Sequence, residues 1–352
     1  MKRPNSFLKF LGRIEGLPVV GVLLLMFGIF VITAPTVFTH LLIYMSFLQT
    51  VPPLLILGLG LTLVITAGEI DLSFPAVVAL AGFVFAWIFK HVHTPWAPWA
   101  GFFLALAAGA LVGYINGLFV AKIGVPSIIS TLAAQFFWYG ITILLANGLQ
   151  LNLQEVEATD VHTIFTGRLF GMLPAQALWA LGLTVFLWFI LNRHKFGEAI
   201  MFIGDNPNVA RVMGIDVEGT KIKLFTWMGV IAAFAGLLLT IEINVFFPTQ
   251  GQGFLLPVMA AVFIGGTLIS GGLGSMVGTF FGSYLIGSLQ AGVVATGITS
   301  YWVQSVMGLI MAAAVALNVT IGEGRFAGLS ARIGHWFTPH PGQSGNDEAH
   351  SK

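Results

Sequence analysis

Ten apolar runs, each close to the length of a membrane-crossing helix, dominate this sequence of 352 residues. A helix needs about 20 apolar residues to cross the hydrocarbon layer of a bilayer. The composition agrees, because 57% of the residues are hydrophobic and only 8% are charged, which excludes an ordinary soluble domain. The runs cover residues 17–34, 45–67, 72–89, 99–121, 126–146, 174–191, 224–241, 255–269, 275–295 and 301–319. The predicted fold is therefore an all-α, polytopic membrane helix bundle with about ten transmembrane helices.

Three of the runs set the limits of this count. Four basic residues precede the first run, which is longer than a signal-peptide core, so we expect a retained first span. The run 255–269 is short, and Pro52 and Pro53 interrupt the second run, so eight to ten spans fit the sequence. We predict a single transmembrane domain over residues 17–320. It lies between a segment at 1–16 and a polar tail at 321–352.

Lysine and arginine are spread unevenly among the connections between the runs. Cytoplasmic connections carry the excess of these residues in membrane proteins. With ten spans and a cytoplasmic N-terminus, thirteen of the 15 fall on the cytoplasmic side. We therefore predict an N-in, C-in topology in which residues 193–223 form a cytoplasmic loop. The connection 147–173, which contains Glu155, Glu157 and Asp160, is then on the outer face, where a soluble donor protein could dock.

The cytoplasmic loop 193–223 holds half of the charged residues found between the first and last runs. A short helix is predicted within it, because Asp205 or Asn206 suits the N-cap and Pro207 the first helical position. Gly214 supplies a left-handed residue to end the helix. A helix of two turns is not stable alone in water, so it must dock on something. It is either a linker on the membrane surface or a contact element for a soluble partner.

Two glycine-rich turns interrupt the apolar pattern, one around Gly68 and one around Gly271. Residues 111–129 and 285–303 also align with one gap, which pairs Asn116 with Gln290. We interpret these features as two related four-helix blocks, since structural repeats are common in transporters. The alternative is that helices rich in glycine and alanine resemble one another by composition. Small residues four apart, as in Gly109/Gly113 and Gly278/Gly282, predict close helix packing.

Charged residues near the spans are few, and two of them occur in the motif GEIDLS. Glu69 and Asp71 could bind a cation or relay a proton if they lay in a pathway. Asp71 is also well placed to accept backbone N–H groups at the start of the following helix. We favour capping for Asp71. Glu242, after the seventh run, is predicted to face outward as a rim contact.

Amide and aromatic side chains mark a candidate pathway. Gln135 is followed directly by four aromatic residues that begin with Phe136, and Asn116 and Asn147 lie within or beside runs. A sugar suits such a set, because its apolar faces stack on rings while its hydroxyls need hydrogen bonds. The alternative is that Gln135 bonds across helices while the rings face lipid. Gln290 joins the candidates as the counterpart of Asn116.

Several kinds of chemistry have no motif in this sequence. A G-x-x-x-x-G-K-[ST] loop is missing, as are the H-E-x-x-H and G-x-S-x-G motifs, and there are no cysteines. We therefore expect no enzyme activity, cofactor, metal site or nucleic-acid partner. If the protein pumps uphill, the energy comes from an ion gradient or from a partner ATPase that contacts the charged loop.

Four segments together resemble one family. GEIDLSFPAVVALAG, INGLFVAKIGVPSIISTL, FGEAIMFIGDNPNVARVMGI and AAVFIGGTLISGGLGSMVGTFFGSYLIG are similar, in order and spacing, to permease subunits of ribose-type carbohydrate ABC importers. The resemblance covers residues 45–320. It implies a homo- or heterodimer of permease chains in the bacterial inner membrane. It also implies a periplasmic sugar-binding protein and a cytoplasmic ABC ATPase with two nucleotide-binding domains.

The resemblance also implies roles for particular residues. The segment 196–215 resembles the part that docks in the ATPase cleft, and the two glycine-rich turns resemble a cytoplasmic gate. The expected coupling residues are Phe196, Gly197, Glu198, Asp205, Asn206, Pro207, Ala210, Arg211, Gly214 and Ile215. The expected gate residues are Gly68, Glu69, Asp71, Ser73, Ser270, Gly271 and Gly272.

The sequence departs from the family pattern at both places. Glu69 stands where the family usually has glycine, and Phe74-Pro75 stands where it has Val-Gly. In the loop, Asp205 replaces glycine, which we expect to strengthen the N-cap, and Asn208 replaces glutamate. The predicted function is import of a monosaccharide or related polyol by alternating access. Alternatives are a nucleoside or branched-chain amino-acid permease of the same architecture, or an ion-coupled secondary transporter that uses Glu69 or Asp71.

Overall fold

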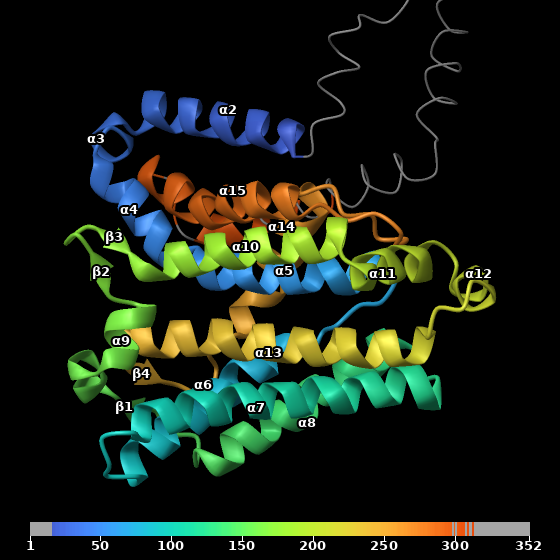
Figure 1. The fold of residues 1–352 in the computed structure, drawn as a ribbon. Helices are drawn as coiled ribbons and strands as arrows, with labels where there is room; N and C mark the ends of the chain where they lie inside the picture. The colour runs from blue at the N-terminus through green and yellow to red at the C-terminus, as the bar shows by residue number, and fades with distance from the viewer. Residues whose placement is uncertain (1–15, 298, 300, 307, 310–311, 313–352) are drawn as a thin grey trace, which may run out of the picture.

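The computed structural model describes residues 16–297, 299, 301–306, 308–309 and 312. Predictions for residues 1–15, for most of the tenth run and for the polar tail lie outside this range. The described residues are almost entirely helical (Figure 1). The longer elements are α2 (Leu17–Thr33), α4 (Leu41–Thr50), α5 (Pro52–Thr66), α6 (Phe74–His91), α7 (Ala97–Leu118), α8 (Ser127–Leu145), α10 (Ala175–Arg193), α11 (Lys195–Asp205), α13 (Val217–Ile243), α14 (Leu255–Ile264) and α15 (Met276–Ala295).

Short elements connect these helices. They are α3 (Pro35–Phe38), α9 (Asp160–Phe165), α12 (Pro207–Val212), the π-helix η1 (Phe119–Ile123) and the 3-10 helices η2 (Gln154–Ala158) and η3 (Gln252–Phe254). Among the described residues, sheet is confined to two antiparallel pairs. β1 (Leu151–Asn152) pairs with β4 (Val245–Phe246), and β2 (Arg168–Leu169) pairs with β3 (Leu173–Pro174).

Fewer helices among the described residues qualify as membrane spans than the ten runs of the sequence, and most of the tenth run lies outside those residues. Six helices in the described part are long and apolar enough to cross a membrane, and a seventh span results if α4 and α5 count as one. These two helices meet at Val51 with a bend of 47°, next to the two prolines. The apolar helices α2 and Gln252–Ile264 are shorter than a full span. The membrane helix bundle is thus supported, and the count of ten is not confirmed.

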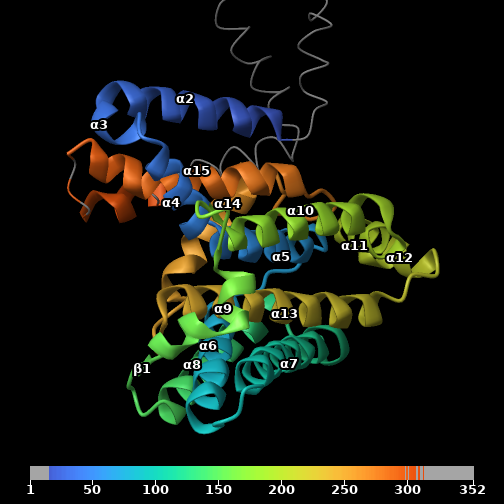
Figure 2. The same ribbon diagram turned by 60° about the vertical axis from the view of Figure 1, so that its left-hand side comes forward.

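Helices α5 and α13 form the centre of the bundle. All 15 residues of α5 are buried, and α13 packs against α5, α6 and α7. In two views, α2, α10, α14 and α15 lie on the α5 side, and α6, α7 and α8 lie on the α13 side (Figures 1 and 2). Close contact between α7 and α13 depends on glycine, because a Cβ at Gly113 would overlap the carbonyl oxygen of Phe225. The predicted small-residue packing at this position is confirmed.

The two features that predicted an internal repeat pair different helices. The turn at Gly68 precedes α6 and the turn at Gly271 precedes α15, so the turns match α6 with α15. The aligned segments 111–129 and 285–303 instead match the end of α7 with the end of α15. Because the whole of α6 intervenes in the first block, the two features do not belong to one repeat. They do not support two related four-helix blocks.

Candidate functional site

The charged loop 193–223 contains two helices, α11 and α12, and the first turns of α13, at one end of the bundle, here called the α12 end (Figure 1). The predicted short helix is α12, and its N-cap is Asn206, whose Oδ1 accepts the N–H groups of Asn208 at 3.0 Å and Val209 at 3.2 Å. Asp205 is the last residue of α11 and has no capping role in α12, so the expectation that it strengthens the N-cap is wrong. Helix α11 was not predicted from the sequence. Its signal was the spacing of Phe196, Ile200 and Ile203, which pack inward.

The end of α12 gives a structural role to three of the expected coupling residues, Ala210, Gly214 and Ile215. Gly214 has φ 84°, its N–H bonds to Arg211 O, and the N–H of Ile215 bonds to Ala210 O, both at 3.0 Å. This is a Schellman ending, in which a left-handed residue closes the helix. Ile215 also packs on a small buried cluster of Ile203, Ala210 and Val217, one residue each from α11, α12 and α13. These three helices are thereby joined into one unit.

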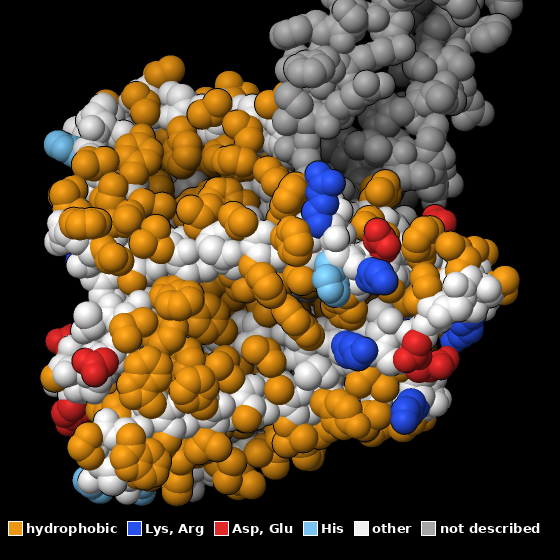
Figure 3. All heavy atoms as spheres, viewed as in Figure 1, with side chains coloured by type: hydrophobic (Ala, Val, Ile, Leu, Met, Phe, Trp, Pro, Cys, Tyr) orange, Lys and Arg blue, Asp and Glu red, His pale blue; other side chains and the backbone are white. Residues whose placement is uncertain are grey.

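The outer surface of this unit mixes apolar and charged side chains. Val212 is 90% exposed, and Phe202, Val209 and Met213 are also exposed. On the face drawn in Figure 3, Lys, Arg, Asp and Glu gather at the two ends of the molecule while hydrophobic side chains cover the middle. The expected coupling residues at this surface are Glu198, Asp205, Asn206, Pro207, Arg211 and Gly214, all exposed. The surface suits a soluble partner better than the hydrocarbon layer.

Phe196 and Gly197 have a different position from the other coupling candidates. The Phe196 ring lies 6.5 Å from that of Trp227 in α13, and a Cβ at Gly197 would overlap carbonyl oxygens at the end of α10. Both residues therefore fasten α11 to the bundle. They hold the surface in place and do not form part of it.

The two glycine-rich turns meet at α11. Gly272 N–H bonds to Thr66 O at 2.8 Å, which ties the second turn to the end of α5. A Cβ at Gly271 would lie 2.9 Å from Gly68 and 2.9 Å from the oxygen of Gly204 in α11. We call Gly68, Gly204, Gly271 and Gly272 the glycine junction. It places the expected gate turns in direct contact with the expected coupling segment, although Ser270 is exposed at its edge.

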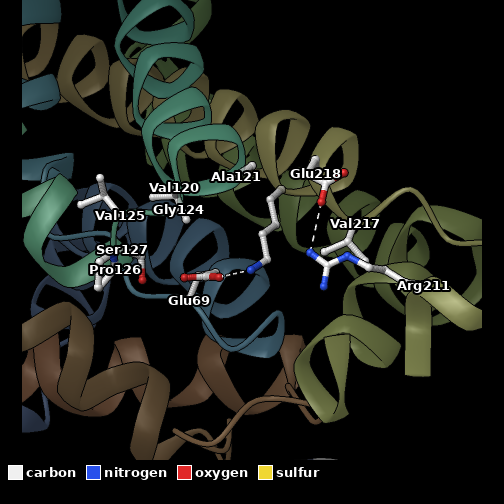
Figure 4. A pocket seen from close by; sticks show the side chains of 11 residues that line it. Glu69, Val120, Ala121, Gly124, Val125, Pro126, Ser127, Arg211, Val217 and Glu218 are labelled. Atoms are coloured by element: carbon white, nitrogen blue, oxygen red, sulfur yellow. Dashed lines mark hydrogen bonds and ion pairs between the residues drawn. The ribbon is translucent and has the colours of Figure 1, made fainter. Parts of the chain in front are cut away.

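Glu69 lies beside this junction and pairs with a residue far along the chain. Its carboxylate accepts a hydrogen bond from Lys221 Nζ in α13. Both line a cavity of about 280 Å³, together with the connection between η1 and α8 (Figure 4). On the other side of the cavity, Arg211 of α12 bonds to Glu218 of α13 at 3.1 Å. No local pattern indicates the Glu69–Lys221 contact, because the partners are 152 positions apart.

The segment 67–73 between α5 and α6 is not helical. Side chains of α8 accept hydrogen bonds from its backbone N–H groups. Ser127 Oγ accepts Ile70 N–H at 3.1 Å, and Thr131 Oγ1 accepts Leu72 N–H at 3.0 Å. One turn further, Gln135 Oε1 accepts Ala76 N–H at 2.9 Å. Ser127 and Thr131 can reach alternate residues of the extended segment, because four helical residues rise ~6 Å and two extended residues span ~6.6 Å. We call Ser127, Thr131 and Gln135 the polar ladder, and their four-residue spacing was its sequence signal.

Asp71 is 2% exposed and does not cap a helix in the expected way. Its Oδ1 accepts the backbone N–H of Ser73 at 2.7 Å and the Ser73 hydroxyl at 2.6 Å, just before α6 begins. Asn116 Nδ2 donates to the same hydroxyl oxygen at 2.8 Å. Burial raises the pKa of the Asp71 carboxyl, which lies outside the candidate spans, and the Ser73 bonds partly oppose the rise. The first turn of α6 is capped by Gln135, so the prediction is corrected in this detail.

The five pathway candidates do not come together. Asn116 bonds to Ser73 and Gln135 to Ala76 in the first turn of α6, whereas Phe136 is 71% exposed on another face of α8. Asn147 is exposed and ends α8 in a left-handed conformation (φ 51°), and Gln290 is exposed on α15. Beside Asn116, an open groove of about 650 Å³ between α7 and α8 is lined almost entirely by apolar side chains.

Glu242 marks the opposite end of the bundle, here called the α9 end. It is half-buried in the last turn of α13, where its carboxylate accepts hydrogen bonds from Gln49 and, at 2.9 Å, from Gln176. The prediction of an outward-facing rim contact is therefore wrong. Lys221 and Glu242 are 21 positions apart in one helix, which corresponds to ~30 Å, about the thickness of the hydrocarbon layer.

We expect the polar ladder to contribute measurably to stability. In Thr131→Val the shape is nearly kept, but the partly buried N–H of Leu72 loses its acceptor, which costs about 1–3 kcal/mol. Thermal unfolding of the purified protein should show a lower midpoint. The matched control is Thr184→Val, because that buried hydroxyl bonds within its own helix, to Ala180 O. Equal midpoints for the two variants would contradict the role of the ladder.

Comparison with known proteins places this arrangement in a family. Residues 43–315 match the family described as the branched-chain amino acid transport system / permease component. The chain therefore belongs to this family of transport permeases. No solved structure gave a significant match.

The relatives specify the resemblance further. The chain is 35% identical over 227 residues to the ribose import permease protein RbsC of Escherichia coli strain K12, over 64% of this chain and 69% of the relative. It is 32% identical over 237 residues to the fructose import permease protein FrcC of Rhizobium meliloti, over 66% of this chain and 65% of that relative. It is 30% identical over 230 residues to the xylose/arabinose import permease protein XylH of Sulfolobus acidocaldarius, over 64% of this chain and 63% of that relative. The predicted resemblance to sugar ABC permeases is confirmed.

Proposed function

We propose that this chain is the membrane subunit of an ATP-binding-cassette importer that moves a monosaccharide or related polyol across the bacterial inner membrane. The observation that carries the proposal is the direct contact of the α11–α12 unit with both glycine-rich turns at the glycine junction. An exposed helix pair that touches an inner gate is what a transporter needs when its energy comes from a separate ATPase. The substrate class follows from the ribose, fructose and xylose/arabinose permeases among the relatives.

In this proposal the α12 end is cytoplasmic, and the topology is N-in and C-in with about ten spans. The uneven distribution of lysine and arginine supports this orientation. A second permease chain pairs with this one, and an ATPase with two nucleotide-binding domains binds α11 and α12. A periplasmic sugar-binding protein docks at the α9 end, where Glu155, Glu157 and Asp160 lie in η2 and α9.

Transport then proceeds by alternating access. ATP binding draws the two nucleotide-binding domains together, and each carries the α11–α12 unit of its permease chain with it. Because that unit is fused to α13 through Ile203, Ala210 and Val217, the movement reaches the bundle as a rigid displacement. The glycine junction transmits it to the ends of α5 and α14, and the path between the two permease chains changes the side on which it is open.

Reconstitution tests this function. Vesicles that contain the chain, its cognate ATPase and its binding protein should take up labelled ribose, fructose or xylose only when ATP is present. Uptake by the chain alone that an ionophore abolishes would favour an ion-coupled transporter instead. ATP-driven uptake of leucine or a nucleoside, without uptake of any sugar, would favour the other substrates found among permeases of this architecture.

A further inference from the structure

The Glu69–Lys221 ion pair is well shielded for a pair beside an open cavity. The two side chains are 12% and 18% exposed, whereas those of Arg211 and Glu218 on the other side of the cavity are each 51% exposed. A charge withdrawn from water to this extent is costly unless it remains paired. The pair is therefore stable only while the segment after α5 and the first turns of α13 stay together, and separating them leaves two unpaired charges.

Lys221 belongs to the part of the chain that receives movement from α12. It follows Glu218 by one turn of α13, and Glu218 accepts the hydrogen bond from Arg211 of α12. Arg211 is also 3.4 Å from the side-chain oxygen of Asn208, which lies in the first turn of the same helix. A displacement of α12 therefore moves the first turns of α13, and Lys221 with them.

Glu69 belongs to the part of the chain that would form the gate. Its own N–H closes the end of α5 by bonding to Val64 O at 3.1 Å. The next residues are held by the polar ladder of α8, through Ile70 N–H and Leu72 N–H. A pull on Glu69 is therefore transmitted to the end of α5, the segment 67–73 and α8.

We infer that the Glu69–Lys221 ion pair is a positioning link of this chain, which transmits movement of α12 to the segment 67–73 and so couples ATP hydrolysis to opening of the inner gate. The inference rests on the proposed function and adds to it a residue pair that is separate from the glycine junction. It gives Glu69, which departs from the usual glycine, a physical role. The carboxylate at this position supplies a contact to α13 that glycine has no side chain to make.

The test is a charge-swap cycle in the reconstituted complex with its ATPase and binding protein. We expect Glu69→Gln and Lys221→Met each to lower the amount of labelled ribose imported per ATP hydrolysed by about fivefold, at the low end of typical coupling between sites. The double variant Glu69→Lys/Lys221→Glu should recover the wild-type ratio to within about twofold. Lys223→Met is the matched control, since Lys223 is exposed on the same helix and should leave the ratio unchanged.

Two results would overturn the link. One is a swap variant no better than the single variants, and the other is single variants whose import-to-ATP ratio equals that of the wild type. Failure of the wild-type complex to import any sugar would instead count against the proposed function, so the two failures are distinguishable.

A second measurement covers the case in which the single variants do not assemble. The chain has no cysteine, so Glu69→Cys/Lys221→Cys can be bridged selectively with a short bis-maleimide. The bridge replaces the ion pair with a covalent link between the same two segments, so it should raise the import-to-ATP ratio above that of the unbridged double-cysteine variant. The same reagent on Glu69→Cys/Lys223→Cys should bridge poorly, because Lys223 is not a partner of Glu69. A bridged protein whose import-to-ATP ratio is no higher than that of the unbridged double-cysteine variant would contradict the inference.

Discussion

Replacing Gly204 with valine is expected to abolish import and to destabilise the purified protein more than any other single change considered. Gly204 lies in α11 where this helix crosses the ends of α5 and the second glycine-rich turn. Any Cβ at this position overlaps the carbonyl oxygen of Thr66, and Thr66 O already accepts the N–H of Gly272. Neither neighbour is a flexible side chain, so the backbone of two elements has to move. We expect a loss of about 3 kcal/mol or more, at the upper end for overpacking.

The measurement for Gly204→Val is the midpoint of thermal unfolding together with retention of the ATPase during purification. A loss of this size lowers the midpoint by roughly 6–12 °C in a domain of this order of size. The matched control is Gly182→Val in α10, where a Cβ meets no atom within 4 Å. Both variants place valine in a helix, so the difference between their unfolding midpoints reports the packing at the glycine junction. A Gly204 variant with the stability and import of the Gly182 variant would show that the junction is not tightly packed.

Local signals predicted α12 well. The N-cap, the proline at the first position and the closing glycine are all encoded within nine residues, 206–214, and each acts through backbone groups of its immediate neighbours. Helix α11 was also within reach, because its inward-facing residues have a helical spacing. It was missed because the charges of the loop concealed this spacing.

Contacts between distant segments could not be predicted in the same way. The polar ladder is visible in the sequence as three polar residues with a four-residue spacing. Its function depends on an extended partner, 57 to 61 positions away, that only the fold brings alongside. The same limit applies to Gln135, whose amide looked suited to a sugar and instead caps α6. Polar side chains in a membrane bundle are needed first by the backbone, since irregular segments there must find donors and acceptors within the protein.

The predicted count of about ten spans is not confirmed for a related reason. Apolar composition shows which residues avoid water, but it does not distinguish a straight crossing from a bent or short helix. The second run is divided at Val51 by a 47° bend, and the run 255–269 yields only a ten-residue helix, α14, before the glycine-rich turn begins. The short helix α14 leads into the glycine junction, whereas the bend at Val51 lies at the opposite end of α5 from it. The C-terminal ends of α5 and α14 are the parts that lead into the two glycine-rich turns of the candidate gate.

The second prediction with a large effect concerns Gly214. Valine at this position has to adopt φ 84°, which costs an L-residue about 1–2 kcal/mol and a β-branched one more. The alternative is to give up the ending of α12, and a helix of six residues has little stability of its own. Since 1.4 kcal/mol is a factor of ten, import per ATP hydrolysed should fall at least about tenfold. A Cβ at Gly214 meets no atom within 4 Å, so the bundle should remain folded with an unchanged unfolding midpoint.

Gly214→Asn is the control that separates backbone conformation from side-chain bulk. Asparagine tolerates the left-handed region much better than valine, so this variant should keep most of the wild-type import-to-ATP ratio. Equal damage from asparagine and valine would mean that the space beside residue 214 is needed by the ATPase itself, and undiminished import with valine would mean that α12 does not transmit movement. Because Gly204 acts through packing and Gly214 through the conformation of one exposed residue, we expect Gly204→Val to lose stability and Gly214→Val to lose only coupling. That contrast distinguishes a coupling element from a merely structural loop.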